Sequence, residues 1–467
     1  MQPAAPVACP GHTLSVSTTS VRATAQRHAA DDVFLAPAEG WALVGAQPLA
    51  QVSNMALLPS LGALKADLNL TYGELGAVVA AFGLARLLTD LPAGGLARRW
   101  NPRSVLLVSF AVGILGSTLG ALAVNAWQVA AVRLLIGVAS SASQAMIMAW
   151  LLGGSGRAAR GKVMACGEAF FSVAGLVIPA LGGLLAVQLS WRAAFVLGAL
   201  AAAIGFATVL MFTRASGGAR SVGLPVEIPA PAIEPRDAAR SVGLPVEIPA
   251  PATEAIGANP AHAPAVTQTN VVPMSGWGAL RAGGRVLLAV YIAAFVVFFC
   301  RNGLLNAVVP VMGTDRLGLQ PYEIGVLFSA VNALSIGVVL LGGRAGDRFG
   351  RYRLLAPGLA VLLVAQLLLF AVRDVVTYAA IALLQGVSFF VNPLPPGLLG
   401  DALPPRARAQ GVAAYRAVSD LAVLSAPAAM GVALQLGGFP AAEFTSVLVI
   451  AVALIAVTLL AARRSAH

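Results

Sequence analysis

Twelve long apolar stretches, spread from Trp41 to Ala461, constrain this chain more than any other feature of its sequence. The stretch 105–124 is typical, because its 20 residues include no charged side chain. An α-helix needs about 20 apolar residues to cross the roughly 30 Å hydrocarbon core of a bilayer. The sequence therefore predicts an all-α membrane protein with twelve transmembrane helices. The spans are expected at 42–64, 73–97, 104–124, 126–152, 162–187, 191–213, 284–313, 322–345, 353–372, 374–400, 407–437 and 439–462.

The composition separates this chain from soluble domains. Charged side chains make up 10% of it, against about 25% in a soluble domain. The net charge of +11 would suit a nucleic-acid partner, but the arginines lie mainly in short connections between apolar stretches. Basic residues in such connections set membrane orientation. We therefore expect the partners to be the lipid bilayer and a small-molecule substrate, with no nucleic acid.

The basic residues are distributed unevenly between the two ends of the predicted helices. Lys and Arg are concentrated in the even-numbered connections, whereas the odd-numbered connections carry only Lys65, Arg192, Arg316 and Arg373. Connections rich in Lys and Arg stay on the cytoplasmic side. The pattern predicts that both termini are cytoplasmic and that the chain is an integral multi-pass protein of a bacterial inner membrane.

The chain divides into two halves and a different kind of segment between them. We expect six-helix bundles at 41–213 and 284–462, with cytoplasmic tails at 1–40 and 463–467. The segment 214–283 is rich in Pro and Ala and contains one 14-residue block twice, at 219–232 and 239–252. Such a composition buries too little apolar surface to offset its ordering entropy. The first tail and this linker are therefore predicted to be disordered.

The two halves also repeat each other in sequence. The segment RLLIGV at 133–138 matches ALLQGV at 382–387. Pro179 and Gly183 of the first half likewise match Pro427 and Gly431 of the second. Internal repeats of this kind are typical of transporters that bind substrate between their halves, near the middle of the membrane.

One connection carries a distinctive motif. The segment GRAGDRFGRYR at 343–353 follows the second span of the second half, and it resembles the loop signature of the major facilitator superfamily. Shorter similar pieces occur in order at 90–94, 133–137, 175–183, 191–195 and 400–405. The resemblance covers the chain outside the first tail and the linker. It implies the major facilitator fold, with two pseudo-symmetric six-helix bundles, a monomer, no cofactor and a proton gradient as the energy source.

In that family the loop signature latches one conformation. The resemblance assigns this role to Gly343, Asp347, Arg348, Gly350 and Arg351.

The first half departs from the latch pattern. Arg98 stands where the second half has Asp347, and Asn101 replaces Gly350. Asp90, a turn or two earlier, is the remaining acid that could serve a first-half latch.

Ionisable side chains inside the predicted spans are costly to bury and are functional candidates. Arg86 and Asp90 are four residues apart, as are Arg416 and Asp420, so each pair could form an ion pair along one helix face. Those pairs could equally do no more than hold helices together. Glu168 occupies the position in the first half that corresponds to Arg416 in the second, which predicts a pairing across the halves and makes Glu168 a candidate proton carrier. The expected charge network is Arg86, Asp90, Glu168, Arg416 and Asp420.

Polar side chains are concentrated on the first, fourth, seventh and tenth spans, which the family resemblance implies line the substrate pathway. Arg301 has no acid within one helical turn, so its partner must come from elsewhere, including the substrate. An alternative is that these side chains only join helices by hydrogen bonds. The predicted cavity residues are Gln47, Gln51, Asn54, Arg133, Gln144, Arg301, Asn302, Asn306, Gln385 and Asn392.

These features predict a secondary active transporter that works by alternating access. Proton-coupled efflux of small amphipathic compounds is the leading hypothesis, and its direction follows from similarity to drug-efflux members of the family. An organic-anion or metabolite carrier is the alternative within transport. A transport-inactive receptor or scaffold that uses the linker is the alternative of another class. The sequence does not predict an enzyme, because it contains no phosphate-binding loop, His/Cys metal cluster or nucleophile–base pair.

Overall fold

The computed structural model describes residues 37–154, 157–213, 276–403 and 405–465. Within these ranges every regular element is a helix. Nine of the described helices are long and apolar enough to cross a membrane. Residues 1–36 of the predicted first tail lie outside the described residues. Residues 214–275 of the predicted linker, with both copies of its repeated block, lie outside them as well.

The first half begins with a broken helix and continues with five long ones. Its elements are α2 (Pro37–Leu49), α3 (Val52–Leu57), the short 3-10 helix η1 (Leu58–Ser60), α4 (Leu61–Asp67), α5 (Tyr72–Arg99), α6 (Pro102–Ala121), α7 (Ala126–Gly154), α8 (Arg157–Gln188) and α9 (Ala193–Phe212).

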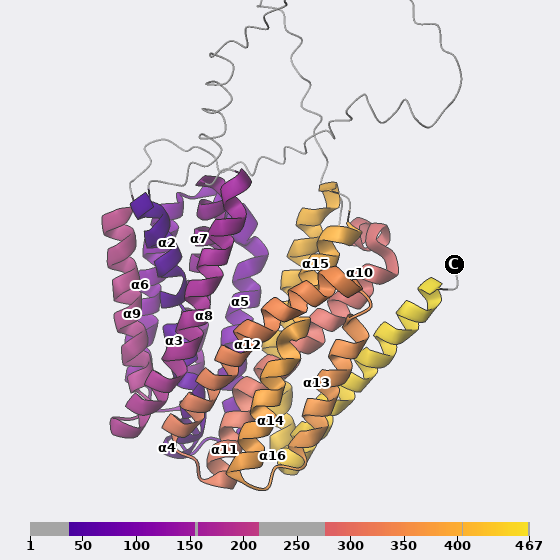
Figure 1. Cartoon of the computed structure of the whole chain (residues 1–467). Helices are drawn as coiled ribbons and strands as arrows, with labels where there is room; N and C mark the ends of the chain where they lie inside the picture. Colours follow the sequence, from indigo (N-terminus) through magenta and orange to yellow (C-terminus); the bar gives the residue numbers. More distant parts are fainter. Residues whose placement is uncertain (1–36, 155–156, 214–275, 404, 466–467) are drawn as a thin grey trace, which may run out of the picture.

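The second half repeats this order with more interruptions. Its elements are α10 (Gly276–Phe299), the π-helix η4 (Cys300–Val308), α11 (Val309–Leu317), α12 (Pro321–Phe349), α13 (Leu355–Leu369), α14 (Val375–Ser388), the 3-10 helix η5 (Phe389–Val391), α15 (Leu394–Ala402) and α16 (Pro405–Ser465). Figure 1 shows the two halves as bundles side by side, α2 to α9 in indigo to magenta and α10 to α16 in salmon to yellow.

Each of the twelve predicted spans falls mainly on helical residues. The first span is divided among α2, α3, η1 and α4, and it contains Pro48 and Pro59, which lack the N–H that a continuous helix would use. The last two spans form α16, which breaks at Gly437 and Gly438. Gly438 has a φ of 66°, a left-handed conformation that glycine adopts without steric cost. This break coincides with the boundary predicted between the eleventh and twelfth spans.

The start of the second half differs from the sequence expectation. Helix α10 begins at Gly276, inside the range predicted for the linker, and continues past Gly284. Gly284 is non-helical, with a φ of 53° and a ψ of −140°, so the segment before it and the predicted span after it are two helical pieces joined at a sharp bend. Periodicity alone could not detect the first piece because it is short.

Apolar side chains fill each half and also cover its outside. Leu106, Phe110 and Ile147 are buried in the first half, and Leu359 and Ile450 in the second. Other large apolar side chains are exposed, as shown by Trp127 at 76% and Leu436 at 83%. In water such exposure would form an aggregation-prone surface, whereas in a bilayer it faces lipid. The distribution fits a membrane protein.

The two halves meet along two pairs of helices, α5 with α16 and α8 with α12. Small residues let the paired backbones approach closely, as expected where lipid removes the hydrophobic driving force between helices. A Cβ atom on Gly76 would lie 2.6 Å from the carbonyl oxygen of Pro427, and one on Gly83 would lie 2.6 Å from the backbone nitrogen of Leu424. These glycines therefore fix the distance between the halves.

At one end of the molecule the halves are also joined by polar contacts. Helices α4 and α11 come together at this end, whereas α15 lies at the opposite end (Figure 1). The Lys65 ammonium lies 2.8 Å from the Asp315 carboxylate, and the Tyr72 hydroxyl donates to the same oxygen at 2.8 Å. The Tyr72 ring packs edge-on against Phe439, with centroids 6.2 Å apart. We call Lys65, Tyr72, Asp315 and Phe439 the closed-end cluster.

The charge of Lys65 persists across the physiological pH range. Partial burial acts to lower the pKa of Lys65, but the hydrogen bond and charge of Asp315 outweigh it, and the net pKa lies above 10.5. A raised lysine pKa stabilises the folded state below the ordinary pKa and is lost only as the pH rises through the raised value. The Lys65 side of the contact is therefore insensitive to pH near neutrality.

Substitution of Gly83 by Val should destabilise the contact between the halves. The new side chain would meet the backbone of Leu424, which cannot move aside, and overpacking of this kind costs about 1–3 kcal/mol. We expect a lower melting temperature for detergent-purified protein, measured by size-exclusion chromatography after heating. Gly337→Val is the matched control, because nothing lies within 4 Å of a Cβ at that position. An equal fall in melting temperature in the two variants would contradict the view that Gly83 sets the distance between the halves.

Reversal of the charges at Lys65 and Asp315 should show coupling between the halves. Lys65→Asp and Asp315→Lys each place like charges together, and the double reversal restores an opposite pair. Because both groups are partly exposed, we expect a coupling of about 0.2–1 kcal/mol in a double-mutant cycle of thermal stability. A double variant that loses the sum of the two single losses would show that the pair contributes nothing.

Candidate functional site

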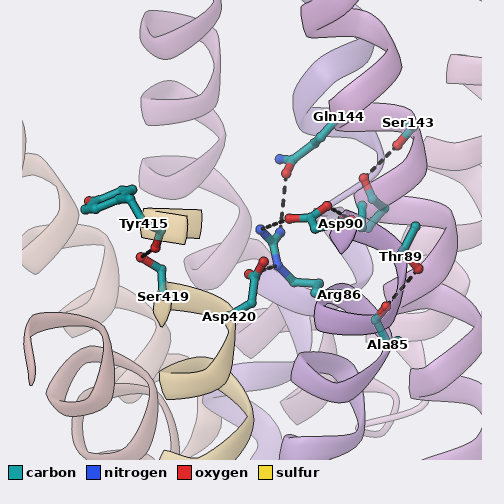
Figure 2. Close-up of polar contacts among 11 residues, drawn as sticks. Ala85, Arg86, Thr89, Asp90, Ser143, Gln144, Tyr415, Ser419 and Asp420 are labelled. Atoms are coloured by element: carbon teal, nitrogen blue, oxygen red, sulfur yellow. Dashed lines mark hydrogen bonds and ion pairs between the residues drawn. The ribbon is translucent and has the colours of Figure 1, made fainter. Parts of the chain in front are cut away.

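A guanidinium group connects three helices from both halves near the centre of the seam. Arg86 of α5 donates from Nε to Oδ1 of Asp420 on α16 at 3.3 Å, and from Nη1 to Oε1 of Gln144 on α7 at 3.3 Å. Its Nη2 also lies 3.9 Å from Oδ2 of Asp90, one turn further along α5. Figure 2 shows Arg86 between these three partners. We call Arg86, Asp90, Gln144 and Asp420 the seam cluster.

The acids of the seam cluster are deeply buried. The side chains of Asp90 and Asp420 are 8% and 4% exposed. Oδ1 of Asp90 accepts a hydrogen bond from the hydroxyl of Ser141, while Oδ2 of each acid has no hydrogen-bond partner. A buried polar atom without a partner costs stability and needs an explanation. Two buried carboxylates with one arginine would carry a net negative charge if both were ionised.

The seam cluster agrees with one sequence expectation and departs from another. Arg86 and Asp90 form the ion pair expected four residues apart on one helix. Asp420 contacts Arg86 of the other half instead of Arg416, and Arg416 is exposed and makes no ion pair among the described residues. The reason is tertiary, because the close glycine contacts between α5 and α16 bring Arg86 onto the face that carries Asp420.

Arg133 of α7 is buried within the first half. It is 3% exposed, and its Nη2 donates to Oδ1 of Asn54 at 3.0 Å. Its guanidinium carbon lies 5.4 Å from the centroid of the Phe82 ring, a cation–π distance, and its Nε has no partner. No carboxylate of the described residues lies within ion-pair distance of Arg133. Asn54 and Arg133, both predicted cavity residues, are thus brought together.

Arg301 lies in the π-helix η4, which the sequence did not predict. Its guanidinium carbon is 5.1 Å from the centroid of the Phe389 ring, and it forms no ion pair with a carboxylate of the described residues. Single π-helical turns are rare and often mark functional sites. Glu168 itself is exposed and forms no ion pair with Arg416 among the described residues, so the expected pairing across the halves is not present in this conformation.

The amides of the seventh span mostly bond within their own helix. The Asn302 side chain donates to the carbonyl oxygen of Phe298 at 2.9 Å, and Asn306 donates to Asn302 at 3.4 Å. These bonds lie within one helical span, so they neither join two helices nor show a cavity-lining role.

Other predicted cavity residues keep unused polar atoms. Gln47, Gln51 and Gln385 are buried, and Oε1 of Gln47, Nε2 of Gln385 and Oδ1 of Asn392 have no hydrogen-bond partner. Gln47 lies beside Gly167 of α8, since a Cβ there would meet its Oε1 at 2.7 Å. Unsatisfied buried amides of this kind are available to a polar ligand or to water.

The predicted latch forms a compact cluster within the second half. Arg351 donates to Asp347 at 2.7 Å and to Asp401 of α15 at 3.0 Å. The hydrogen bond that Arg351 donates to Asp347 is the main cause that raises the pKa of Arg351. Gly350 has a φ of 89° and ends α12, which explains why this position needs glycine.

Two further predicted latch residues, Arg348 and Gly343, make no contact among the described residues that would join α12 to another helix. The Arg348 guanidinium lies 5.4 Å from the Phe349 ring, and a Cβ on Gly343 would meet nothing within 4 Å. Asp401 occurs in a family-like segment, yet its pairing with Arg351 was not predicted.

The corresponding region of the first half is organised differently. Asn101 caps the N-terminus of α6 through a hydrogen bond from the backbone N–H of Arg103 to its side chain. Asp90 belongs to the seam cluster, so it does not pair across the loop as Asp347 does. The side chain of Arg98 lies outside the described side chains.

Comparison with known proteins gives the family. The model of the Major Facilitator Superfamily matches residues 43–344 and 290–467. A comparison with curated protein sequences finds no match.

Several solved structures share the fold at low sequence identity. A bacterial homologue of the human lysosomal transporter Spinster, in an inward-facing and occupied conformation, aligns with a TM-score of 0.70 and 13% identity over 90% of this chain and 96% of that one. The nucleoside transporter NupG aligns at 0.63 and 13%, over 91% and 98% of the two chains. The human organic anion transporter MFSD10 aligns at 0.58 and 15%, over 90% and 99%. With the family match spanning both halves, the chain is a member of the Major Facilitator Superfamily, with that family's fold of transmembrane helices.

Proposed function

We propose that this membrane transporter is a proton-coupled secondary carrier that exports small amphipathic molecules by alternating access. The seam cluster is the observation that carries the proposal. It places two buried acids and one arginine on helices of opposite halves, where a change of protonation alters how the halves hold together. Ionisable groups at such depth are costly and are kept for function.

The arrangement of the halves supports alternating access. Polar contacts join them at the closed-end cluster, and close packing continues along α5 and α16 as far as Arg86 and Asp420. The loop after α12 lies at the opposite end, and its arginines favour a cytoplasmic location by the positive-inside rule. The conformation would then be closed outward and open inward, which is also the direction in which the structure of the Spinster homologue faces.

The interior of the seam suits a substrate with a large apolar part and few polar groups. Arg133 and Arg301 each lie against an aromatic ring, and the unsatisfied amides of Gln47, Gln385 and Asn392 supply single hydrogen bonds. Binding sites for small molecules combine apolar surface with a few polar groups in this way. The proton gradient supplies the energy, so the proposal requires no cofactor. It also takes the protein as a monomer of a bacterial inner membrane with both termini cytoplasmic.

An organic-anion carrier is the second candidate, and one observation favours it. Neither Arg133 nor Arg301 has a carboxylate of the described residues within ion-pair distance, so an anionic substrate could balance either of them. Human MFSD10, one of the proteins that share the fold, is an organic anion transporter by name.

Transport by purified protein in liposomes tests both candidates. With an imposed pH gradient, we expect accumulation of ethidium, a cationic amphipathic probe, with neutral chloramphenicol and anionic fluorescein as the other members of the panel. Arg86→Gln leaves two buried acids without a cation. A loss of about 1.4 kcal/mol in the interaction of the charged form already corresponds to a factor of ten. We therefore expect gradient-driven accumulation to fall about tenfold or more. Arg373→Gln, at an exposed connection, is the matched control and should stay within about twofold of the wild type.

Each member of the panel has a decisive outcome. Accumulation of fluorescein alone would favour the anion carrier over the amphipathic exporter. Accumulation that is the same with and without the pH gradient would contradict proton coupling. If none of the three probes accumulates, the proposed transport activity is contradicted.

A further inference from the structure

The two acids of the seam cluster are arranged as a pair that holds one proton. Asp90 on α5 and Asp420 on α16 lie on either side of Arg86 (Figure 2). Nη2 of Arg86 lies 3.9 Å from Oδ2 of Asp90, and its Nε lies 3.3 Å from Oδ1 of Asp420. One guanidinium balances the charge of one carboxylate, so the second buried acid is compensated only if it holds a proton.

The unused oxygens of the pair point to the same conclusion. Oδ1 of Asp420 accepts from Arg86, and Oδ1 of Asp90 accepts from Ser141. Oδ2 of each acid is buried and has no hydrogen-bond partner. Two ionised carboxylates would leave both oxygens charged and without a hydrogen bond, whereas a proton on one of them removes the excess charge.

No second cation of the described residues compensates the pair. On α7, Gln144 and Ser141 face the cluster and are neutral, while Arg133 is turned to Asn54 and Phe82. On η4, Arg301 lies over Phe389, and on α16 the exposed Arg416 makes no ion pair with Asp420. With both acids ionised, the cluster would carry one net negative charge inside the membrane. With one proton it is neutral.

We propose that Asp90 and Asp420 share a single proton, and that this proton is the one coupled to substrate movement. The inference rests on the proposed proton-coupled transport and names its carrier. Uptake forms an O–H bond on one Oδ2 atom, and release breaks it and leaves two carboxylates on either side of one guanidinium. One proton enters from one face of the membrane and leaves to the other in each cycle, with no other reactant.

The position of the pair links its proton to conformation. Asp90 belongs to the first half and Asp420 to the second, so the protonated, neutral cluster holds α5 against α16. Loss of the proton leaves two like charges facing each other across the seam, and like charges at such distances repel strongly in a medium of low dielectric. Deprotonation therefore favours separation of the halves at this level, while protonation favours the contact seen here. Glu168, the carrier expected from the sequence, lies outside this cluster and on the surface of α8.

Asparagine variants separate a proton carrier from a structural contact. Asp90→Asn and Asp420→Asn keep the shape and the hydrogen bonds but cannot release a proton. In proteoliposomes with ethidium as the probe, we expect each variant to lose gradient-driven accumulation at least tenfold. Exchange of internal for external ethidium without a gradient should be reduced much less than accumulation, because exchange needs no net movement of protons.

Asp374→Asn is the matched control, since this exposed residue caps α14 and asparagine caps helices equally well. It should leave both accumulation and exchange unchanged. Retention of wild-type accumulation by either seam variant would overturn the inference. Loss of exchange together with accumulation would also overturn it, because the acids would then only hold the halves together.

A measurement without substrate distinguishes failure of this inference from failure of the proposed function. Infrared spectroscopy of the purified protein near neutral pH should show the carbonyl band of a buried, protonated carboxyl group, and both asparagine variants should lack it. If the wild type carries no probe but shows this band, the transport proposal fails and the shared proton stands. If the wild type lacks the band, or if both variants retain it, the shared proton is refuted whatever the protein transports.

Discussion

One guanidinium group, that of Arg86, carries the polar connection between the halves near the centre of the seam. Hydrocarbon offers no water to compensate buried charge, so every ionisable group at this depth must find its partners within the protein. Arg86 meets Asp90 of its own helix, Gln144 of a neighbour and Asp420 of the other half. The position of α5 against α16 and the charge of the seam thus depend on the same side chain.

The two sets of contacts across the seam differ in kind. The closed-end cluster is partly exposed to water, where an ion pair such as Lys65 with Asp315 is worth at most about 1 kcal/mol and is easily exchanged for hydration. The seam cluster is buried, so removal of one partner there leaves an uncompensated charge, at a cost of several kcal/mol. A carrier of the proposed kind needs both, because the closed-end contact must open readily while the central one must respond to a specific event.

The helical spans could be predicted from the sequence because length and hydropathy are local properties. The break at Gly437 and Gly438 coincided with a predicted boundary for the same reason. The pairing of charges could not be predicted, since it depends on which helices lie side by side. Arg416 is the nearer arginine to Asp420 along the chain, yet Arg86, far away in sequence, is its partner in space. The sequence likewise did not predict the pairing of Lys65 with Asp315, since both are simply charged residues near helix ends.

The π-helix η4 has a consequence for the register of the seventh span. A π-helix closes its hydrogen bonds five residues back, so it holds more residues per turn than the α-helix on either side. The faces on which Arg301 and Asn306 lie are therefore rotated with respect to α10, although the chain is continuous. Removal of a single residue between Cys300 and Val308 would let this stretch wind as an ordinary α-helix and leave α11 on nearly the same face. The same deletion in a regular α-helix would turn everything beyond it by about 100°. The π-helix thus accommodates a surplus residue without changing which side chains of α11 face the first half.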